Sequence, residues 1–159
     1  MKNSHQVLRA ENLYKQYGKR LVVRAVDIKV KKGEIVGLLG PNGAGKTTTF
    51  YMITGMIKPT KGKIFLDTKD ITQDAMYKRS RQGIGYLAQE PSIFGKLSVE
   101  DNLKLVLEMT DLSKEDQQIK IEQLLKSLTI QHLRNNKGNS LSGGERRRVE
   151  ICRTLAIDP

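Results

Sequence analysis

Apolar and polar residues alternate along the first part of the chain. Apolar positions from Val26 to Val30 alternate with the charged Asp27 and Lys29. An alternation of period two is typical of a half-buried antiparallel strand. The pattern predicts that residues 7–30 form strands that are broken by a turn.

Longer apolar runs and a change of period follow. The continuously apolar segment 35–39 predicts a parallel strand covered on both faces, and segments 64–66 and 84–88 predict two more strands. Apolar residues at helical spacing predict a helix over about residues 46–56. One βα unit therefore stands inside a β-rich first half.

The second half of the chain has the pattern of helices. Ser98 and Ser113 are each followed three residues later by an aspartate, Asp101 or Asp116, which is a helix N-cap signal. Apolar stripes follow both serines, and a polar loop over 134–140 leads to a final basic helix. We expect an α/β fold with an N-terminal antiparallel β-subdomain and a helical subdomain.

The composition fits one soluble domain. The 159 residues are 38% hydrophobic and carry a net charge of +11, so the partner to consider is anionic: nucleic acid, acidic lipid or nucleotide phosphate. Cys152 is the only cysteine, which excludes an intrachain disulfide and fits a reducing, cytoplasmic setting. No apolar run approaches the roughly 18 residues of a membrane span. MKNSHQ at the start lacks the apolar core of a signal peptide.

A phosphate-binding loop stands between the apolar run 35–39 and the helix after it. It matches G-x-x-x-x-G-K-[ST] in the strand-to-helix context that the motif requires. Its glycines let the backbone point N–H groups at phosphate oxygens, and the helix start favours an anion. The lysine reaches the outer phosphates and Thr47 ligates Mg²⁺. A glycine-rich turn with an incidental lysine is the alternative, which the complete motif disfavours. The predicted nucleotide-binding residues are Gly40, Pro41, Asn42, Gly43, Ala44, Gly45, Lys46, Thr47 and Thr48.

Four motifs follow one another along the chain: Tyr17 in KQYGKR, GPNGAGKTT at 40–48, Gln89 in YLAQEPSIF and LSGGE at 141–145. Together, and in this order, they resemble the ATP-binding subunits of ABC (ATP-binding cassette) transporters. The runs around them, above all GERRRVEI, are similar to the ATPases of bacterial lipopolysaccharide export systems. ATP and Mg²⁺ are the cofactors that this resemblance implies.

The resemblance also implies how the chain is divided. Residues 1–159 would form a single, incomplete ABC nucleotide-binding domain. The β-subdomain and P-loop core cover about 1–88, the helical subdomain about 90–140, and the signature helix 141–159.

Two of the motifs contribute single side chains in this family. The resemblance implies that Tyr17 stacks on adenine, a contact worth roughly 1–3 kcal/mol, and that the Gln89 amide ligates Mg²⁺ or the attacking water. An ordinary strand-end tyrosine is the alternative for Tyr17.

The signature motif would act on a second subunit. In the family it caps the γ-phosphate held by the P-loop of a partner cassette, head to tail, so that ATP drives closure of a dimer. The residues suit an anion, because a serine N-cap, exposed glycine N–H groups and the helix dipole meet at one point. The signature residues are Leu141, Ser142, Gly143, Gly144 and Glu145.

The segment after Gln89 resembles the surface that receives a coupling helix from membrane permease subunits. Ile93, Phe94 and Leu97 are the candidate contacts, and packing at the entry of the next helix is the alternative reading. Such contacts would place the protein at the inner face of the cytoplasmic membrane through its partners.

The family's remaining catalytic groups find no match. They are an Asp-Glu pair at the end of an apolar strand and a later His, whereas Glu145, Glu150 and Asp158 lie on or beside the signature helix. Of the catalytic machinery only Lys46 and Gln89 are present. Loss of a general base costs about 10²–10⁴ in rate. We therefore expect a C-terminally truncated cassette, with part of its core sheet missing, that binds nucleotide weakly and does not hydrolyse ATP alone.

Two other functions stay open. A soluble ABC ATPase acting on nucleic acid or ribosomes fits the charge, but the compact interval from Thr48 to Leu141 disfavours it. Arg146, Arg147 and Arg148 point to different sides of a helix and form no flat patch, which also disfavours nucleic acid. A non-catalytic nucleotide-binding fragment is the third reading.

Overall fold

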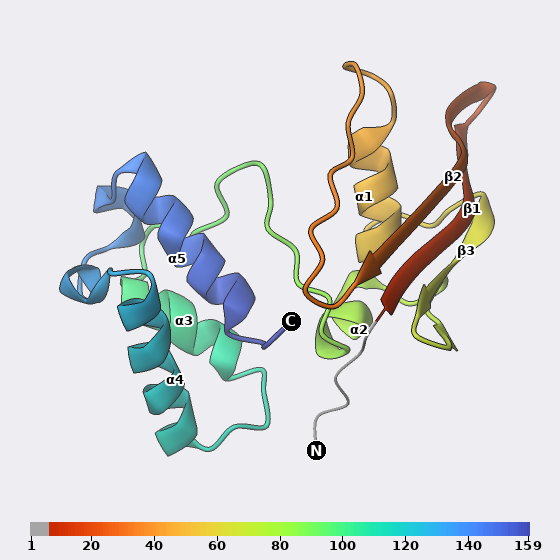
Figure 1. The fold of residues 1–159 in the computed structure, drawn as a ribbon. Helices are drawn as coiled ribbons and strands as arrows, with labels where there is room; N and C mark the ends of the chain where they lie inside the picture. Colours follow the sequence, from red (N-terminus) through yellow and green to blue (C-terminus); the bar gives the residue numbers. More distant parts are fainter. Residues whose placement is uncertain (1–6) are drawn as a thin grey trace. The chain divides into compact units, whose positions relative to one another are not determined.

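The computed structural model describes residues 7–159 and divides the chain into two compact units. The described part of the first unit runs to Gln82, and the second unit is Gly83–Pro159. The first contains the sheet and the phosphate loop, and the second contains the longer helices (Figure 1).

An antiparallel sheet of order β2-β1-β3-β4 organises the first unit. Leu8 pairs with Val30 on one side and with Leu66 on the other, so β1 lies between β2 and β3. The predicted alternation is confirmed: Val26, Ile28 and Val30 are half-buried while the residues between them are exposed. The strands are β1 (Val7–Tyr17), β2 (Arg20–Lys31), β3 (Lys61–Leu66) and β4 (Lys69–Asp70).

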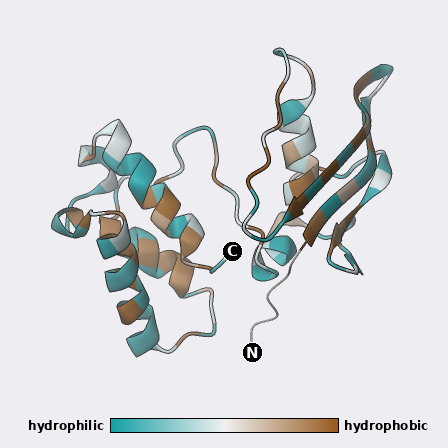
Figure 2. Cartoon of the chain, in the orientation of Figure 1, coloured by the Kyte–Doolittle hydropathy of each residue, from teal (hydrophilic) through white to brown (hydrophobic). Residues whose placement is uncertain are grey.

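Helix α1 (Lys46–Thr54) contacts β1 and β2 and confirms the predicted helix. The short helix α2 (Met76–Arg81) has no clear apolar period and was not predicted from the sequence. Hydrophobic residues recur among hydrophilic ones along the strands and on α1 (Figure 2). The buried apolar residues of the unit are Ala10, Leu13, Val23, Met52, Ile53, Ile64, Leu66 and Ile71.

A buried arginine in α2 donates hydrogen bonds to the C-terminal end of α1. Arg79 is 1% exposed, and its Nη1 donates to the carbonyl oxygens of Met52 and Ile53 at 2.8 and 2.6 Å. Its Nε and Nη2 donate to the carbonyls of Asp74 and Thr72. Burial lowers the pKa of the guanidinium, and the nearby Asp74 and Asp70 carboxylates oppose this effect. The last carbonyls of a helix have no partner within the helix, so Arg79 closes the end opposite the phosphate loop.

The prediction of strands over 35–39 and 84–88 was wrong. Neither segment forms a strand in the described residues, and Ile35 and Leu39 are 99% and 92% exposed. A parallel strand exists only within a ladder of hydrogen bonds, and no strand in residues 7–159 pairs with either segment. Apolar composition shows what a segment can bury, and says nothing of whether a neighbouring strand is there to cover it.

Three helices form the second unit around one apolar core. α3 (Val99–Leu107) and α4 (Lys114–Ser127) begin at Ser98 and Ser113, whose side chains accept the N–H groups of Asp101 and Asp116, as the sequence predicted. α5 is Gly143–Leu155. The 3₁₀ turn η1 (Gln131–Leu133) directly precedes the predicted polar loop over 134–140, and the 3₁₀ turn η2 (Gly138–Ser140) ends that loop. The core is Val99, Leu103, Leu107, Ile121, Leu124, Leu125, Ile130, Leu133, Leu141, Val149, Cys152 and Ala156.

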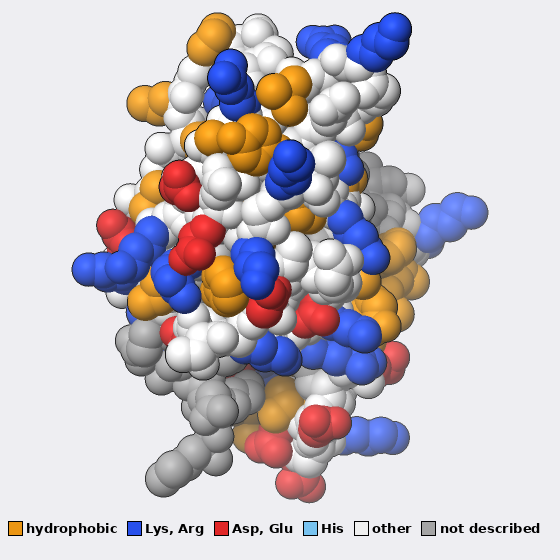
Figure 3. All heavy atoms as spheres, turned by 90° about the vertical axis from the view of Figure 1, so that its right-hand side faces the viewer, with side chains coloured by type: hydrophobic (Ala, Val, Ile, Leu, Met, Phe, Trp, Pro, Cys, Tyr) orange, Lys and Arg blue, Asp and Glu red, His pale blue; other side chains and the backbone are white. Residues whose placement is uncertain are grey.

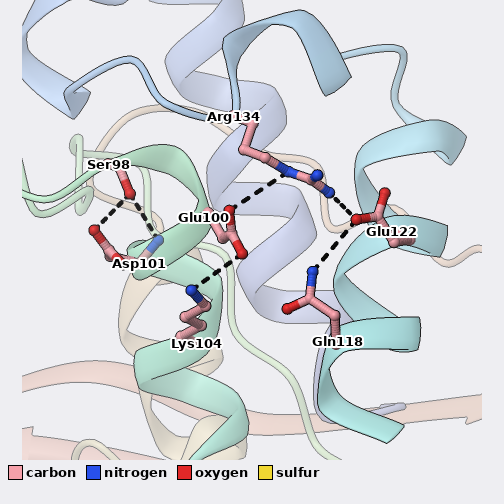
Figure 4. A network of polar contacts seen from close by, with 7 residues as sticks. All are labelled: Ser98, Glu100, Asp101, Lys104, Gln118, Glu122 and Arg134. Carbon is pink, nitrogen blue, oxygen red and sulfur yellow. Dashed lines mark hydrogen bonds and ion pairs between the residues drawn. The ribbon is translucent and has the colours of Figure 1, made fainter. Parts of the chain in front are cut away.

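Two polar features complete this unit. Arg134 pairs with Glu100 of α3 and with Glu122 of α4, and Glu100 also pairs with Lys104 at 3.1 Å (Figure 4). The ion pairs therefore link α3 to α4 through the loop after η1.

Cys152 is buried in α5, and burial raises the pKa of its thiol to about 11.

None of the helices in residues 7–159 combines the length and the hydropathy that crossing a bilayer would require.

Candidate nucleotide-binding site

The phosphate loop has the backbone that its glycines permit. Gly40, Gly43 and Gly45 all have positive φ angles, of 155°, 81° and 86°. Residues other than glycine rarely adopt such backbone angles. The loop therefore curls as the motif predicts and leads directly into α1 at Lys46.

One of these glycines is also required by packing. A Cβ on Gly45 would lie 2.6 Å from the carbonyl oxygen of Val22 and 3.0 Å from a methyl of Val23. A Cβ on Gly43 would meet nothing within 4 Å. Gly45 thus seats the start of α1 against β2, a contact between distant segments that the motif alone could not reveal.

The side chain of Lys46 folds back over the loop. Its Nζ donates to the carbonyl oxygens of Gly40 and Pro41 at 2.7 and 2.8 Å. The buried Thr49 hydroxyl donates to the Gly45 carbonyl, while Thr47 is exposed. Lys46 therefore holds a cationic group at the loop, where phosphate oxygens could replace the two carbonyls as its partners.

The start of α1 has no side-chain cap. Its N-cap is Gly45, and no acidic residue lies in its first turn. The first N–H groups of a helix have no partner within the helix and attract anions. The loop, the uncapped helix start and Lys46 together form a donor set that fits the phosphates of a nucleotide.

The net positive charge of the described residues lies in the unit that contains this loop. Residues 7–82 contain 16 Lys and Arg against 6 Asp and Glu, a net charge of +10, whereas residues 83–159 contain 11 of each and are neutral. Lys and Arg side chains are spread over the face that carries the sheet (Figure 3). A cationic surface favours the approach of an anionic ligand.

The Tyr17 ring is exposed, as stacking on a ligand would require. It ends β1, is 51% exposed, and has the Lys15 ammonium 5.1 Å from its ring centroid. Its side chain is thus not used by the core, although stacking on adenine stays a prediction.

Gln89 is exposed in the second unit, whereas Thr47 belongs to the first. Residues 7–159 contain no group of three His, Cys, Asp or Glu side chains that could hold a metal ion by itself. The two residues that the sequence predicts as Mg²⁺ ligands thus belong to different compact units, and their role stays a prediction.

The signature residues form a complete helix cap. The Ser142 side chain accepts the Glu145 N–H, and the Glu145 carboxylate accepts the N–H and hydroxyl of Ser142, both at 2.8 Å. These bonds, the backbone one first, lower the pKa of Glu145. Leu141 is buried as an anchor, while Gly143 and Gly144 are exposed and have open space on the side of a Cβ.

The acidic residues and arginines of this region have partners of their own. Glu150 is 4% exposed and accepts the Ser92 N–H, and Asp158 pairs with Lys120. Arg146 donates to the Leu141 carbonyl and Arg147 to the Ala88 carbonyl. These two arginines bind different parts of the unit, which agrees with the prediction that the basic run forms no flat patch.

The three candidate contacts for a permease differ in exposure. Ile93 packs against the apolar core, as expected of helix-entry packing. Phe94 is 46% exposed, with the Arg153 guanidinium 4.8 Å above its ring, and Leu97 is half-buried. Phe94 is the one of the three whose side chain offers a large exposed apolar surface.

The glycine loop with Lys46, the antiparallel sheet beside it and the capped signature helix define a P-loop ATP-binding cassette. The chain belongs to the ABC transporter family, because residues 23–159 match the sequence profile of that family. The match covers both the phosphate loop and the signature.

Similar proteins agree with this assignment. The chain is 55% identical over 154 residues to the lipopolysaccharide export system ATP-binding protein LptB of Acidithiobacillus ferridurans, and 54% identical over 153 residues to LptB of Escherichia coli K12. The two matches cover 97% and 96% of this chain, respectively, and 64% of the length of each relative.

Solved structures have the same fold. An ATP-binding cassette of an ABC transporter in its ADP conformation has a TM-score of 0.83 and 31% identity, covering 98% of this chain and 66% of that one. A dimeric bacterial ABC transporter cassette has a TM-score of 0.81 and 30% identity, covering 96% of this chain and 70% of that one.

Proposed function

We propose that this chain is the ATP-binding, energy-coupling subunit of a membrane exporter and that lipopolysaccharide is the transported class. The observation that carries the proposal is the uncapped start of α1 behind a positive-φ glycine loop, in the same chain as a signature helix. The substrate class comes from the names of the LptB relatives.

The phosphate loop would hold ATP through its backbone N–H groups and Lys46. Lys46 would exchange its two carbonyl partners, Gly40 and Pro41, for phosphate oxygens. Thr47 and Gln89 would hold Mg²⁺, which neutralises phosphate charge when it is bound, and Tyr17 would stack on adenine.

The signature residues would act on a partner. Ser142, Gly143 and Gly144 would present a hydroxyl and exposed N–H groups to the γ-phosphate held by a second cassette, head to tail. A dimeric structure of a related cassette supports such an assembly. Closure on two ATP molecules would couple binding energy to the membrane subunits.

Hydrolysis belongs to the family, and for this chain alone we expect binding without measurable turnover. Glu145 and Glu150 are the acidic residues on the signature helix, and both carboxylates already accept hydrogen bonds within the second unit. Glu150 is buried with both oxygens bonded, and Glu145 caps its own helix, so we assign neither as the general base for an attacking water.

Nucleotide binding tests the core of the proposal. Lys46→Ala should weaken binding of a fluorescent ATP analogue by about ten- to a hundred-fold, since bonds to charged groups contribute about 1.5–3 kcal/mol. Lys61→Ala removes an exposed lysine from β3 and should leave the affinity unchanged. Equal affinity of Lys46→Ala and the unmodified chain would refute the proposed site.

Coupling to a membrane partner needs its own experiment. The chain should co-purify with membrane permease subunits, and Phe94→Asp should abolish this, because the exposed ring would be replaced by a charge. Leu105→Asp, at an exposed apolar position on α3, is the matched control and should retain the partner. Such contacts would place the protein on the inner face of the cytoplasmic membrane.

A further inference from the structure

The segment that carries Gln89 is bonded to the signature helix on both sides of Gln89. Ahead of it, the Ala88 carbonyl accepts Nη1 of Arg147 at 2.6 Å. Behind it, the Ser92 N–H donates to Oε1 of Glu150 at 2.6 Å, and the Ser92 carbonyl accepts Nη1 of Arg153 at 2.6 Å. The exposed residues 89–91 therefore lie between two points that one helix, α5, fixes.

Glu150 and Arg147 form the centre of this arrangement. The Glu150 side chain is only 3% exposed, and its second oxygen pairs with Arg147 Nη1 at 3.1 Å. A buried carboxylate is costly unless it is paired and hydrogen-bonded. Here one oxygen holds the backbone at Ser92 while the other holds the guanidinium that binds Ala88. A single acidic group thus connects to both ends of the Gln89 segment.

We propose that Glu150, acting through Ser92 and Arg147, is a positioning residue that fixes Gln89 relative to the signature helix. Gln89 and the Ser142–Gly144 start of α5 then move as one body. This inference rests on the proposed function for its consequence: a phosphate captured at Ser142 would be coupled to the position of the amide that meets Mg²⁺ or water at Gln89. The contacts themselves lie within one compact unit and do not require nucleotide.

Amide hydrogen exchange and ¹⁵N relaxation of the whole chain, followed by NMR, test the arrangement. In Glu150→Ala the Ser92 amide loses a charged acceptor and should exchange about ten- to a hundred-fold faster. The amides of Asp101 and Asp116, which are bonded to the N-cap serines of α3 and α4, should stay within about two-fold.

Two conservative variants separate positioning from packing. Glu150→Gln keeps an oxygen that can accept the Ser92 N–H but loses the ion pair with Arg147. Its Ser92 amide should stay protected, while the Gln89 backbone and side-chain amide become as mobile as in Arg147→Met. Arg147→Met should also leave Ser92 protected, because the bond from Ser92 to Glu150 remains.

Glu100→Ala is the matched control, since it removes a carboxylate from the Arg134 ion pairs of Figure 4. It should not change Ser92 or Gln89. The inference is overturned if Glu150→Ala leaves both residues unchanged, or if Glu150→Ala and Glu100→Ala accelerate all amides alike. Adding ATP and Mg²⁺ to the unmodified chain reports separately on the proposed function, because exchange at Ser92 is measured without nucleotide.

Discussion

Two helices of this chain, α1 and α5, have glycines at their starts, and the two starts are built differently. α1 begins at Gly45, with no side-chain cap and no acid in its first turn. α5 begins at Ser142, whose N–H and hydroxyl are both bonded to the Glu145 carboxylate. The first start leaves donors for an anion from solution, whereas the second already contains an anion of its own.

The difference shows what each site requires in order to work. In the proposed function, ATP would reach the phosphate loop with Lys46 exchanging its two carbonyl partners. The signature would have to release part of its cap before Ser142 could donate to a phosphate held by a second cassette. Capture by the signature is therefore expected to follow nucleotide binding at the loop.

The largest effect on this comparison should come from Gly45→Ala. The new Cβ would stand 2.6 Å from the Val22 carbonyl at a positive φ, so we expect a loss of about 3 kcal/mol in the free energy of unfolding. Gly43→Ala has the same φ problem with open space around it and should cost about 1–2 kcal/mol. Urea denaturation of both variants measures this. Equal losses would show that the contact with β2 is unimportant.

A smaller effect is expected at the capped helix. Ser142→Ala removes the N-cap of α5 and should cost about 1 kcal/mol. Ser113→Ala removes the equivalent side-chain cap of α4 and should cost a similar amount, so it calibrates the measurement. Gly143→Ala, inside the first turn of α5, should be neutral or slightly stabilising. A loss above about 2 kcal/mol at Ser142 alone would indicate a role beyond capping.

The smallest effect is a dependence on pH. The bonds from Ser142 lower the pKa of Glu145 from its ordinary value of 4.5. A carboxyl with a lowered pKa contributes stability above its unfolded value and loses it as the pH falls through the folded value. The protection of the amides in the first turn of α5, measured against their intrinsic exchange rate at each pH, should therefore fall only below about pH 4.5. Glu145→Gln should remove this step, and a step that persists in it would assign the effect to another group.

The sequence predicted best where local chemistry decides the structure. The spacing of Ser98 from Asp101 and of Ser113 from Asp116 located two helix starts, because capping needs only residues three positions apart. The motif at 40–48 likewise carries its own conformational requirement. The strand over 35–39 failed because a parallel strand depends on neighbours that the run itself does not encode.

Buried charges were beyond sequence reasoning for a related reason. Arg79 and Glu150 belong to residue types that are almost never fully buried unless they are paired, so a surface position was the natural expectation. Their partners are carbonyls and N–H groups of segments distant in the chain, such as Met52 for Arg79 and Ser92 for Glu150. The one available signal was that Glu150 directly follows Val149 on a helix with an apolar face.

The enclosed thiol of Cys152 makes this chain convenient to label. The thiolate is the reactive form of a cysteine. Because the pKa of the buried Cys152 thiol is raised to about 11, this thiol is almost entirely protonated and also covered at neutral pH. A cysteine introduced at an exposed position such as Glu90 or Arg148 should therefore react with a maleimide dye well ahead of the native one. Fluorescent reporters can thus be attached to the Gln89 segment or to the signature helix without first removing a background cysteine.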